Sequence, residues 1–173
     1  MKKVITLAVM LLVAAFAVEA NAQMSQLVGK WKAKDASTYL GDGFECTKGT
    51  IAFDADGEGE LEVEADGKVE LDDQYTLYMT IELDLEFTWR LSGSTLSLSN
   101  VDFEIDFDDL SITPYSEEYN QLIPILKEAL LAEYQEHKEV YASSFLDKLG
   151  DLSVRFINND TLQLGDETYI RIR

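Results

Sequence analysis

Few side chains in this sequence could carry out acid–base, nucleophilic or metal chemistry. The chain has one histidine, His137, and one cysteine, Cys46. Without a second histidine or cysteine, it has no zinc-ligand spacing. A Ser-His-Asp triad would have to use His137, and no nucleophile-elbow motif or glycine-rich phosphate loop is present. We therefore expect the protein not to be an enzyme and to use no cofactor.

The remaining reactive groups are carboxylates, because 33 Asp and Glu stand against 14 Lys and Arg, for a net charge of −19. This charge repels nucleic acid and anionic membranes, so we expect no nucleic-acid partner. Two carboxylates could serve a glycosidase, but among so many acids any such pair has almost no specificity. The run Asp54-Ala55-Asp56-Gly57 fails the calcium-loop pattern, because Ala52 and Val63 occupy its first and last ligand positions. We interpret that run as a turn.

Acidic residues recur at every second position on three successive predicted strands. They are Glu60, Glu62 and Glu64, then Glu82, Asp84 and Glu86, then Asp102, Glu104 and Asp106. Like charges directly across a sheet destabilise it. One interpretation is a solvated face that salt screens. The alternative is that Glu82, Asp84, Asp102 and Glu104 hold a divalent metal ion such as calcium.

The longest alternating stretch, Tyr75–Leu91, must position these side chains. Its odd-numbered residues are apolar and its even-numbered residues are polar, which predicts a half-buried β-strand. At about 3.3 Å per residue it would extend about 55 Å, so we expect it to bend around a core as barrel strands do. Ser92-Gly93 predicts a hairpin. A change of phase near Ser99-Asn100 predicts a β-bulge.

This hairpin and bulge predict a register in which Trp89 lies opposite Leu96. Beyond the bulge, Asp84 is then expected opposite Asp102, and Glu82 opposite Glu104. The rows of carboxylates would therefore face one another across neighbouring strands.

A helical period replaces the alternation after Thr113, which we expect to cap a helix over about Pro114–Leu149. Pro124 is expected to kink or split that helix. Its predicted apolar stripe includes His137, which we interpret as a core or interface residue. The other members are Tyr119, Leu122, Leu126, Ala129, Leu130, Tyr134, Val140, Tyr141, Ser144, Phe145 and Leu149. Short strands near Leu152–Phe156, Leu162–Leu164 and Ile170–Ile172 follow. The sequence thus predicts a mainly β fold: an antiparallel up-and-down barrel of about eight to ten strands, with one long helix inserted before the last strands.

The N-terminus carries the pattern of a secretory signal peptide over residues 1–22. Lys2 and Lys3 precede an apolar run, and Ala20-Asn21-Ala22 supplies a small-residue cleavage pattern. We expect export to the periplasm or beyond after cleavage before Gln23, no membrane span in the mature chain, and a single domain over residues 23–173. In an oxidising compartment a single cysteine forms no internal disulfide, so we interpret Cys46 as a small buried apolar residue. The alternatives are an intermolecular disulfide or a reactive thiol.

Two short motifs suggest a family. Leu27-Val28-Gly29-Lys30-Trp31 resembles the Gly-x-Trp first strand of lipocalins, and Asp56-Gly57-x-Gly59 with the closing strands is similar to lipocalin-like domains (calycin-type barrels) exported by Bacteroides-type bacteria. The resemblance implies that Trp31 closes the barrel floor and that Arg171 or Arg173 packs over it. The chain departs from the family in two ways. It has no Thr-Asp-Tyr motif, and its helix comes before the last strands.

The leading functional hypothesis is an exported binding protein for a small apolar ligand inside the barrel. The expected lining residues are Phe53, Leu77, Met79, Phe87, Trp89 and Phe103. The same side chains could instead fill a closed core, because an eight-stranded barrel is only just wide enough for a small ligand. Two alternatives stay open: a non-catalytic interaction module that binds a protein or glycan partner through its surface, and an acidic calcium-binding surface protein.

Overall fold

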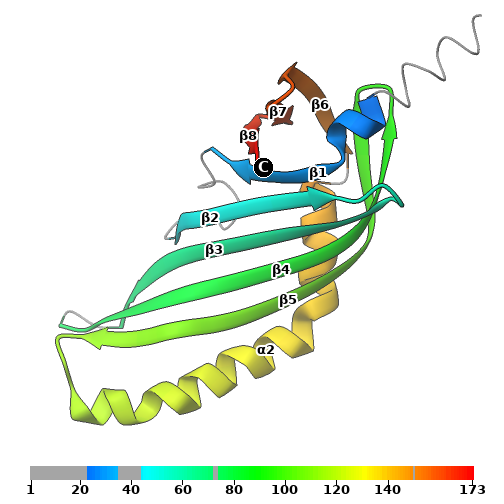
Figure 1. Ribbon diagram of the computed structural model, residues 1–173. Helices are drawn as coiled ribbons and strands as arrows, with labels where there is room; N and C mark the ends of the chain where they lie inside the picture. Colours follow the sequence, from blue (N-terminus) through cyan, green and yellow to red (C-terminus); the bar gives the residue numbers. More distant parts are fainter. Residues whose placement is uncertain (1–22, 35–43, 72–73, 150) are drawn as a thin grey trace, which may run out of the picture.

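A computed structural model of the chain describes residues 23–34, 44–71, 74–149 and 151–173 (Figure 1). The predicted signal peptide, residues 1–22, lies outside the described residues. A short helical segment over residues 23–27 includes Leu27, which was predicted to open the first strand. Within the described ranges, no helix is both long enough and apolar enough to cross a membrane.

Eight strands form one closed antiparallel barrel in the order β1 to β8, with β8 paired to β1. In chain order the elements are β1 (Gly29–Ala33), β2 (Phe44–Phe53), β3 (Glu58–Glu70), β4 (Thr76–Ser92), β5 (Thr95–Thr113), the helix α2 (Glu117–Leu149), β6 (Asp151–Asn158), β7 (Thr161–Leu164) and β8 (Glu167–Arg171). The mainly β class, the up-and-down antiparallel order and the long helix before the last three strands are therefore confirmed.

The strands differ greatly in length, and this decides the shape. β4 and β5 have 17 and 19 residues, whereas β7 and β8 have 4 and 5. The short strands close the barrel at one end only, and the long strands continue past them as an open sheet along which α2 runs (Figure 1). β4 alternates as predicted, with its odd-numbered residues buried from Leu77 to Trp89. Part of its length extends beyond the closed ring, so it does not simply wrap around one core.

Two hydrophobic clusters follow from this shape. The larger one fills the closed end and includes the fully buried Trp31, Phe53 and Leu85. The smaller one lies under the open sheet, where Leu77, Met79, Ile81, Phe107 and Ile112 pack against apolar side chains of α2. The helix thus covers the apolar face that the short strands leave open.

The predicted hairpin register is wrong by two residues. Ser92 pairs with Thr95, so the turn is Gly93-Ser94, where Gly93 has a φ of 59°. Trp89 consequently lies opposite Leu98 instead of Leu96. Glycine adopts positive φ without steric cost, which places it at the first position of the loop.

The predicted bulge near Ser99-Asn100 is confirmed. Asn100 has a φ of 52°, and the register shifts between the pairs Thr88–Ser99 and Glu86–Asp102. The turn lies one residue later than predicted, so the paired residues beyond the bulge also differ from the prediction. Asp84 faces Glu104 and not Asp102, and Glu82 faces Asp106 and not Glu104.

The helix begins later than predicted. Thr113 is the last residue of β5, and Ser116 caps α2 by accepting a hydrogen bond from the backbone N–H of Tyr119 at 3.4 Å. Pro124 lies inside α2, which continues unbroken and curves along the sheet (Figure 1).

The docked face of α2 also differs from the predicted stripe. Ile123, Leu126 and Leu130 pack on the sheet. Leu122, Val140 and Tyr141 are 48%, 64% and 44% exposed. His137 is exposed as well, so its interpretation as a core residue is wrong, and an interface role stays a prediction. The curved helix docks along a line that drifts from a straight 3.6-residue stripe.

Candidate functional site

The six predicted ligand-lining residues are all buried, but the structure divides them between the two clusters. Phe53, Phe87, Trp89 and Phe103 belong to the barrel cluster, and Leu77 and Met79 to the cluster under α2. The ring of Phe53 makes edge contacts with Phe87 and Trp89, at centroid distances of 6.0 and 5.5 Å. These side chains pack on one another as a hydrophobic core does.

Of the two candidate arginines, Arg171 is the one that lies over Trp31. Its guanidinium carbon is 4.1 Å from the centre of the indole ring. The guanidinium donates hydrogen bonds to the carbonyls of Val28 (2.9 Å), Asn159 (3.1 Å) and Gln26. The indole N–H of Trp31 donates to the carbonyl of Leu27 at 2.8 Å. Arg173 lies elsewhere and pairs with Asp160 at 2.8 Å.

The other side of the long sheet carries what we call the acidic face: nine carboxylates on the outer side of β3, β4 and β5. They stand in three rows across the strands. The rows are Glu60–Glu86–Asp102, Glu62–Asp84–Glu104 and Glu64–Glu82–Asp106. The alternation that buries the apolar residues places every one of these carboxylates on the opposite side of the sheet. The sequence predicted the face, and the structure decides which residues share a row.

Cations lie along both borders of this face. On the β3 side, Glu62 is 3.1 Å from Lys30 and 3.6 Å from Lys48. Its hydrogen bonds with Thr50 and then Lys30 hold the pKa of Glu62 below the ordinary value. These contacts compensate part of the negative charge at that border.

On the β5 side, two lysines of α2 reach the carboxylates of β5. Lys127 is 3.0 Å from Asp106, and Lys138 is 2.6 Å from Asp102. The hydrogen bonds from Lys127 and Lys138 lower the pKa of Asp106 and of Asp102 respectively. No sequence pattern pointed to these pairs, because each joins residues from separate elements.

The middle column, on β4, has no such compensation. Within the part of the chain that the structure describes, Glu82, Asp84 and Glu86 make no ion pair and no side-chain hydrogen bond. Negative charge is therefore concentrated along the centre of the face, between two borders that carry lysines.

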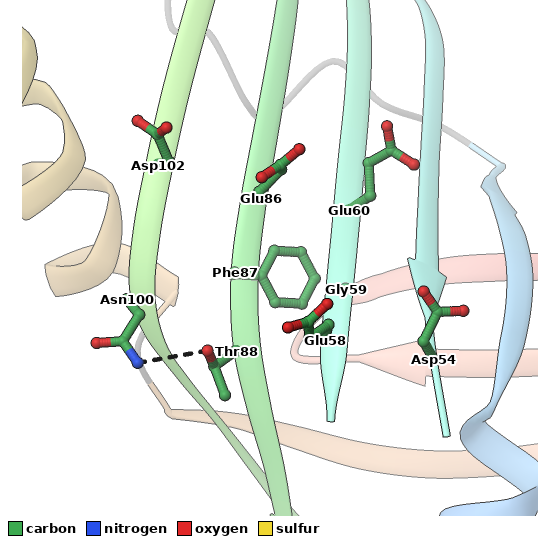
Figure 2. Close-up of a pocket in the computed structure, with 9 residues that line it drawn as sticks. All are labelled: Asp54, Glu58, Gly59, Glu60, Glu86, Phe87, Thr88, Asn100 and Asp102. Carbon is green, nitrogen blue, oxygen red and sulfur yellow. Dashed lines mark hydrogen bonds between the residues drawn. The ribbon is translucent and has the colours of Figure 1, made fainter. Parts of the chain in front are cut away.

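The acidic face is hollowed as well as charged. One hollow has a volume of about 350 Å³. The carboxylates of Glu60, Glu86 and Asp102, which line it, lie in a row across three strands (Figure 2). A second hollow of about 380 Å³ lies over Asp84 and Glu104, and a third of about 230 Å³ lies over Glu64 and Glu82. Polar side chains line all three, so they suit a charged or polar occupant.

The predicted metal ligands do not form a coordination site. Glu82, Asp84, Asp102 and Glu104 are spread over three rows by the corrected register. Among the described residues, no three His, Cys, Asp or Glu side chains are grouped so that they could hold a metal ion.

Cys46 is partly buried, and its thiol lies 3.2 Å from the carbonyl of Lys48 and 3.3 Å from that of Glu64. Burial raises the pKa of this thiol, which favours the inert protonated form. Cys46 was predicted to be a small buried apolar residue, and the structure gives it partial burial only.

Comparisons with known proteins add no assignment, since no protein-family model and no curated protein matches the chain.

Proposed function

We propose that the protein is a non-catalytic, lipocalin-like interaction module whose acidic face binds a basic segment of a partner protein. The observation that carries the proposal is the uncompensated column of Glu82, Asp84 and Glu86 in the centre of a hollowed face. The packing of Arg171 over Trp31 supports the lipocalin-like part. Export after cleavage before Gln23, which we also propose, would present this face to proteins outside the cytoplasm.

The spacing of the column suits an extended basic chain. Side chains at alternate positions of a strand are about 6.6 Å apart, and an extended segment with Lys or Arg at every second residue has the same repeat. Each cation could then meet one carboxylate of β4. Lys30 and Lys48 on one border and Lys127 and Lys138 on the other would repel the segment from the sides. The preferred direction of binding therefore runs along β4.

The two other hypotheses predict different ligands. A bound calcium ion would need several carboxylates converging on one point, whereas these carboxylates are arranged in rows. An apolar ligand inside the barrel would have to separate core side chains such as Phe53 and Trp89. Internal ligand binding stays a prediction, and native mass spectrometry of the exported protein would show such a ligand as added mass.

The test uses a fluorescent peptide of alternating lysine and threonine, with fluorescence anisotropy as the readout. We compare the wild type with the triple variant Glu82→Gln, Asp84→Asn, Glu86→Gln. Three exposed ion pairs at about 0.5 kcal/mol each correspond to about a tenfold loss of affinity. The matched control is Glu118→Gln, Glu128→Gln, Glu136→Gln, which removes the same charge from exposed positions of α2.

Loss of affinity in the β4 variant but not in the control supports the proposal. Equal losses in both would show attraction to net charge alone and would reject the acidic face as a site. A calcium-specific rise in melting temperature at matched ionic strength, abolished in the β4 variant, would instead favour the metal hypothesis.

A further inference from the structure

The long strand β5 has an open edge. It pairs with β6 only through Thr95, Leu96 and Ser97, although it continues to Thr113. No other described strand pairs with that edge. Antiparallel pairing alternates, so the backbone groups of Phe103 and Phe107 point away from β4 and toward the open edge. A strand edge that no neighbouring strand covers is a template for pairing with another chain.

Side chains satisfy these edge groups in place of a strand. The N–H of Phe103 donates to Oδ1 of Asp102 at 3.0 Å, and the N–H of Phe107 donates to Oδ1 of Asp106 at 2.8 Å. The hydroxyl of Tyr134, on α2, donates to the carbonyl of Phe103. Each of these contacts occupies a group that a neighbouring strand would need.

The same two aspartates also tie α2 to the edge. Lys138 binds Asp102 and Lys127 binds Asp106, at 2.6 and 3.0 Å. The aspartates are four residues apart, or about 13 Å along a strand. The lysines are eleven residues apart, or about 16 Å and close to three full helical turns, so both leave the same side of α2. The pairs Lys138–Asp102 and Lys127–Asp106 therefore lie along one line of contact between α2 and β5.

We infer that α2 guards the open edge of β5, and that the partner it excludes is β5 of a second copy of this chain. Every copy carries the same edge, and two such edges related by a twofold axis are self-complementary in an antiparallel pair. The aspartates are the central parts of the guard, because each one caps a backbone N–H and binds a lysine of the covering helix. This role is independent of the proposed binding of a basic segment on β4.

The test compares Asp102→Ala, Asp106→Ala with the control Glu104→Ala, Asp108→Ala. The control removes the same charge from the same face of β5, from residues whose side chains make no hydrogen bond or ion pair among the described residues. Hydrogen exchange at the amides of Phe103 and Phe107 is expected to rise at least about tenfold in the first variant, because these groups open to water. Sedimentation velocity is expected to show a concentration-dependent dimer for that variant and not for the control.

Unchanged exchange at both amides would overturn the inference. Faster exchange without self-association, or equal self-association in the control, would overturn the guarding role. If circular dichroism shows that the aspartate variant does not fold, Lys127→Gln, Lys138→Gln provides the second test, since it keeps both N–H caps and removes only the ties to α2. Increased self-association of that variant supports the inference, and association equal to the wild type contradicts it.

Discussion

Replacing Gly29 with alanine tests the contact between the start of β1 and Arg171 of β8. Gly29 has a φ of +130°, and a Cβ atom added there would lie 2.6 Å from Nη1 of Arg171. Backbone strain of this kind costs about 1–3 kcal/mol for a residue other than glycine. Moving the guanidinium would also break its 2.9 Å hydrogen bond to Val28, at a cost of about 1.5–3 kcal/mol. We expect a total loss of about 2.5–6 kcal/mol, a large share of the stability of a typical domain.

Urea unfolding followed by tryptophan fluorescence measures this loss. The matched control is Gly93→Ala, because Gly93 also has a positive φ, 59°, but no described residue other than its chain neighbours has an atom within 4 Å of the added Cβ. The control should cost only the backbone strain, about 1–2 kcal/mol for an L-residue in the left-handed region. A loss for Gly29→Ala no larger than for the control would refute the steric part of the reasoning.

A double-mutant cycle with Arg171→Met separates the steric clash between the added Cβ and the guanidinium from the backbone strain at position 29. With the guanidinium removed, Gly29→Ala should cost less than it does in the wild type, because nothing remains to be displaced. The expected coupling is about 1–3 kcal/mol. If the two losses of stability are additive, Gly29 and Arg171 act independently. The contact with Arg171 would then not be the reason why position 29 requires glycine.

Two other perturbations address the acidic face. Asp84→Lys should stabilise the fold by about 1 kcal/mol, because it turns two repulsive cross-strand pairs, with Glu62 and Glu104, into attractive ones. The gain should shrink in 1 M salt, where the Debye length is about 3 Å, and an equal gain at both salt concentrations would contradict the electrostatic cause. Glu62→Gln should destabilise the fold at pH 7 but not at low pH. The pKa of Glu62 is lowered in the folded state, so its contribution is present above the ordinary glutamate value of 4.5 and is lost as the pH falls through the folded value. Urea midpoints of both proteins against pH check this, and a difference that persists after Glu62 is protonated would refute it.

The local sequence pattern was sufficient to predict the long strands and the positions of the acidic face. The alternation along β4 and the acidic positions of β3 and β5 follow a period of two, which every residue of a strand obeys whatever its partner. The same is true of the bulge at Asn100, because a change of phase within one strand is visible in the sequence. The change to a helical period placed α2 before the last strands.

Register and partners depended on contacts between distant residues. The position of Gly93 moved the turn by one residue, which moved every pair on β4 and β5 by two. Arg171 and Arg173 are equivalent in sequence, and only the pairing of β8 with β1 decides that Arg171 lies over Trp31.

The sequence did not predict that α2 covers the β5 edge, because this also depends on contacts between distant residues. The path of α2 along the sheet brings Lys138 to Asp102 and Lys127 to Asp106, and no local period encodes that path. The sequence by itself thus determined which residues are buried along a strand and which carry charge on its other side. The tertiary structure alone decided which of those charges meet a cation and which stay uncompensated, because this depends on how separate elements cross in space.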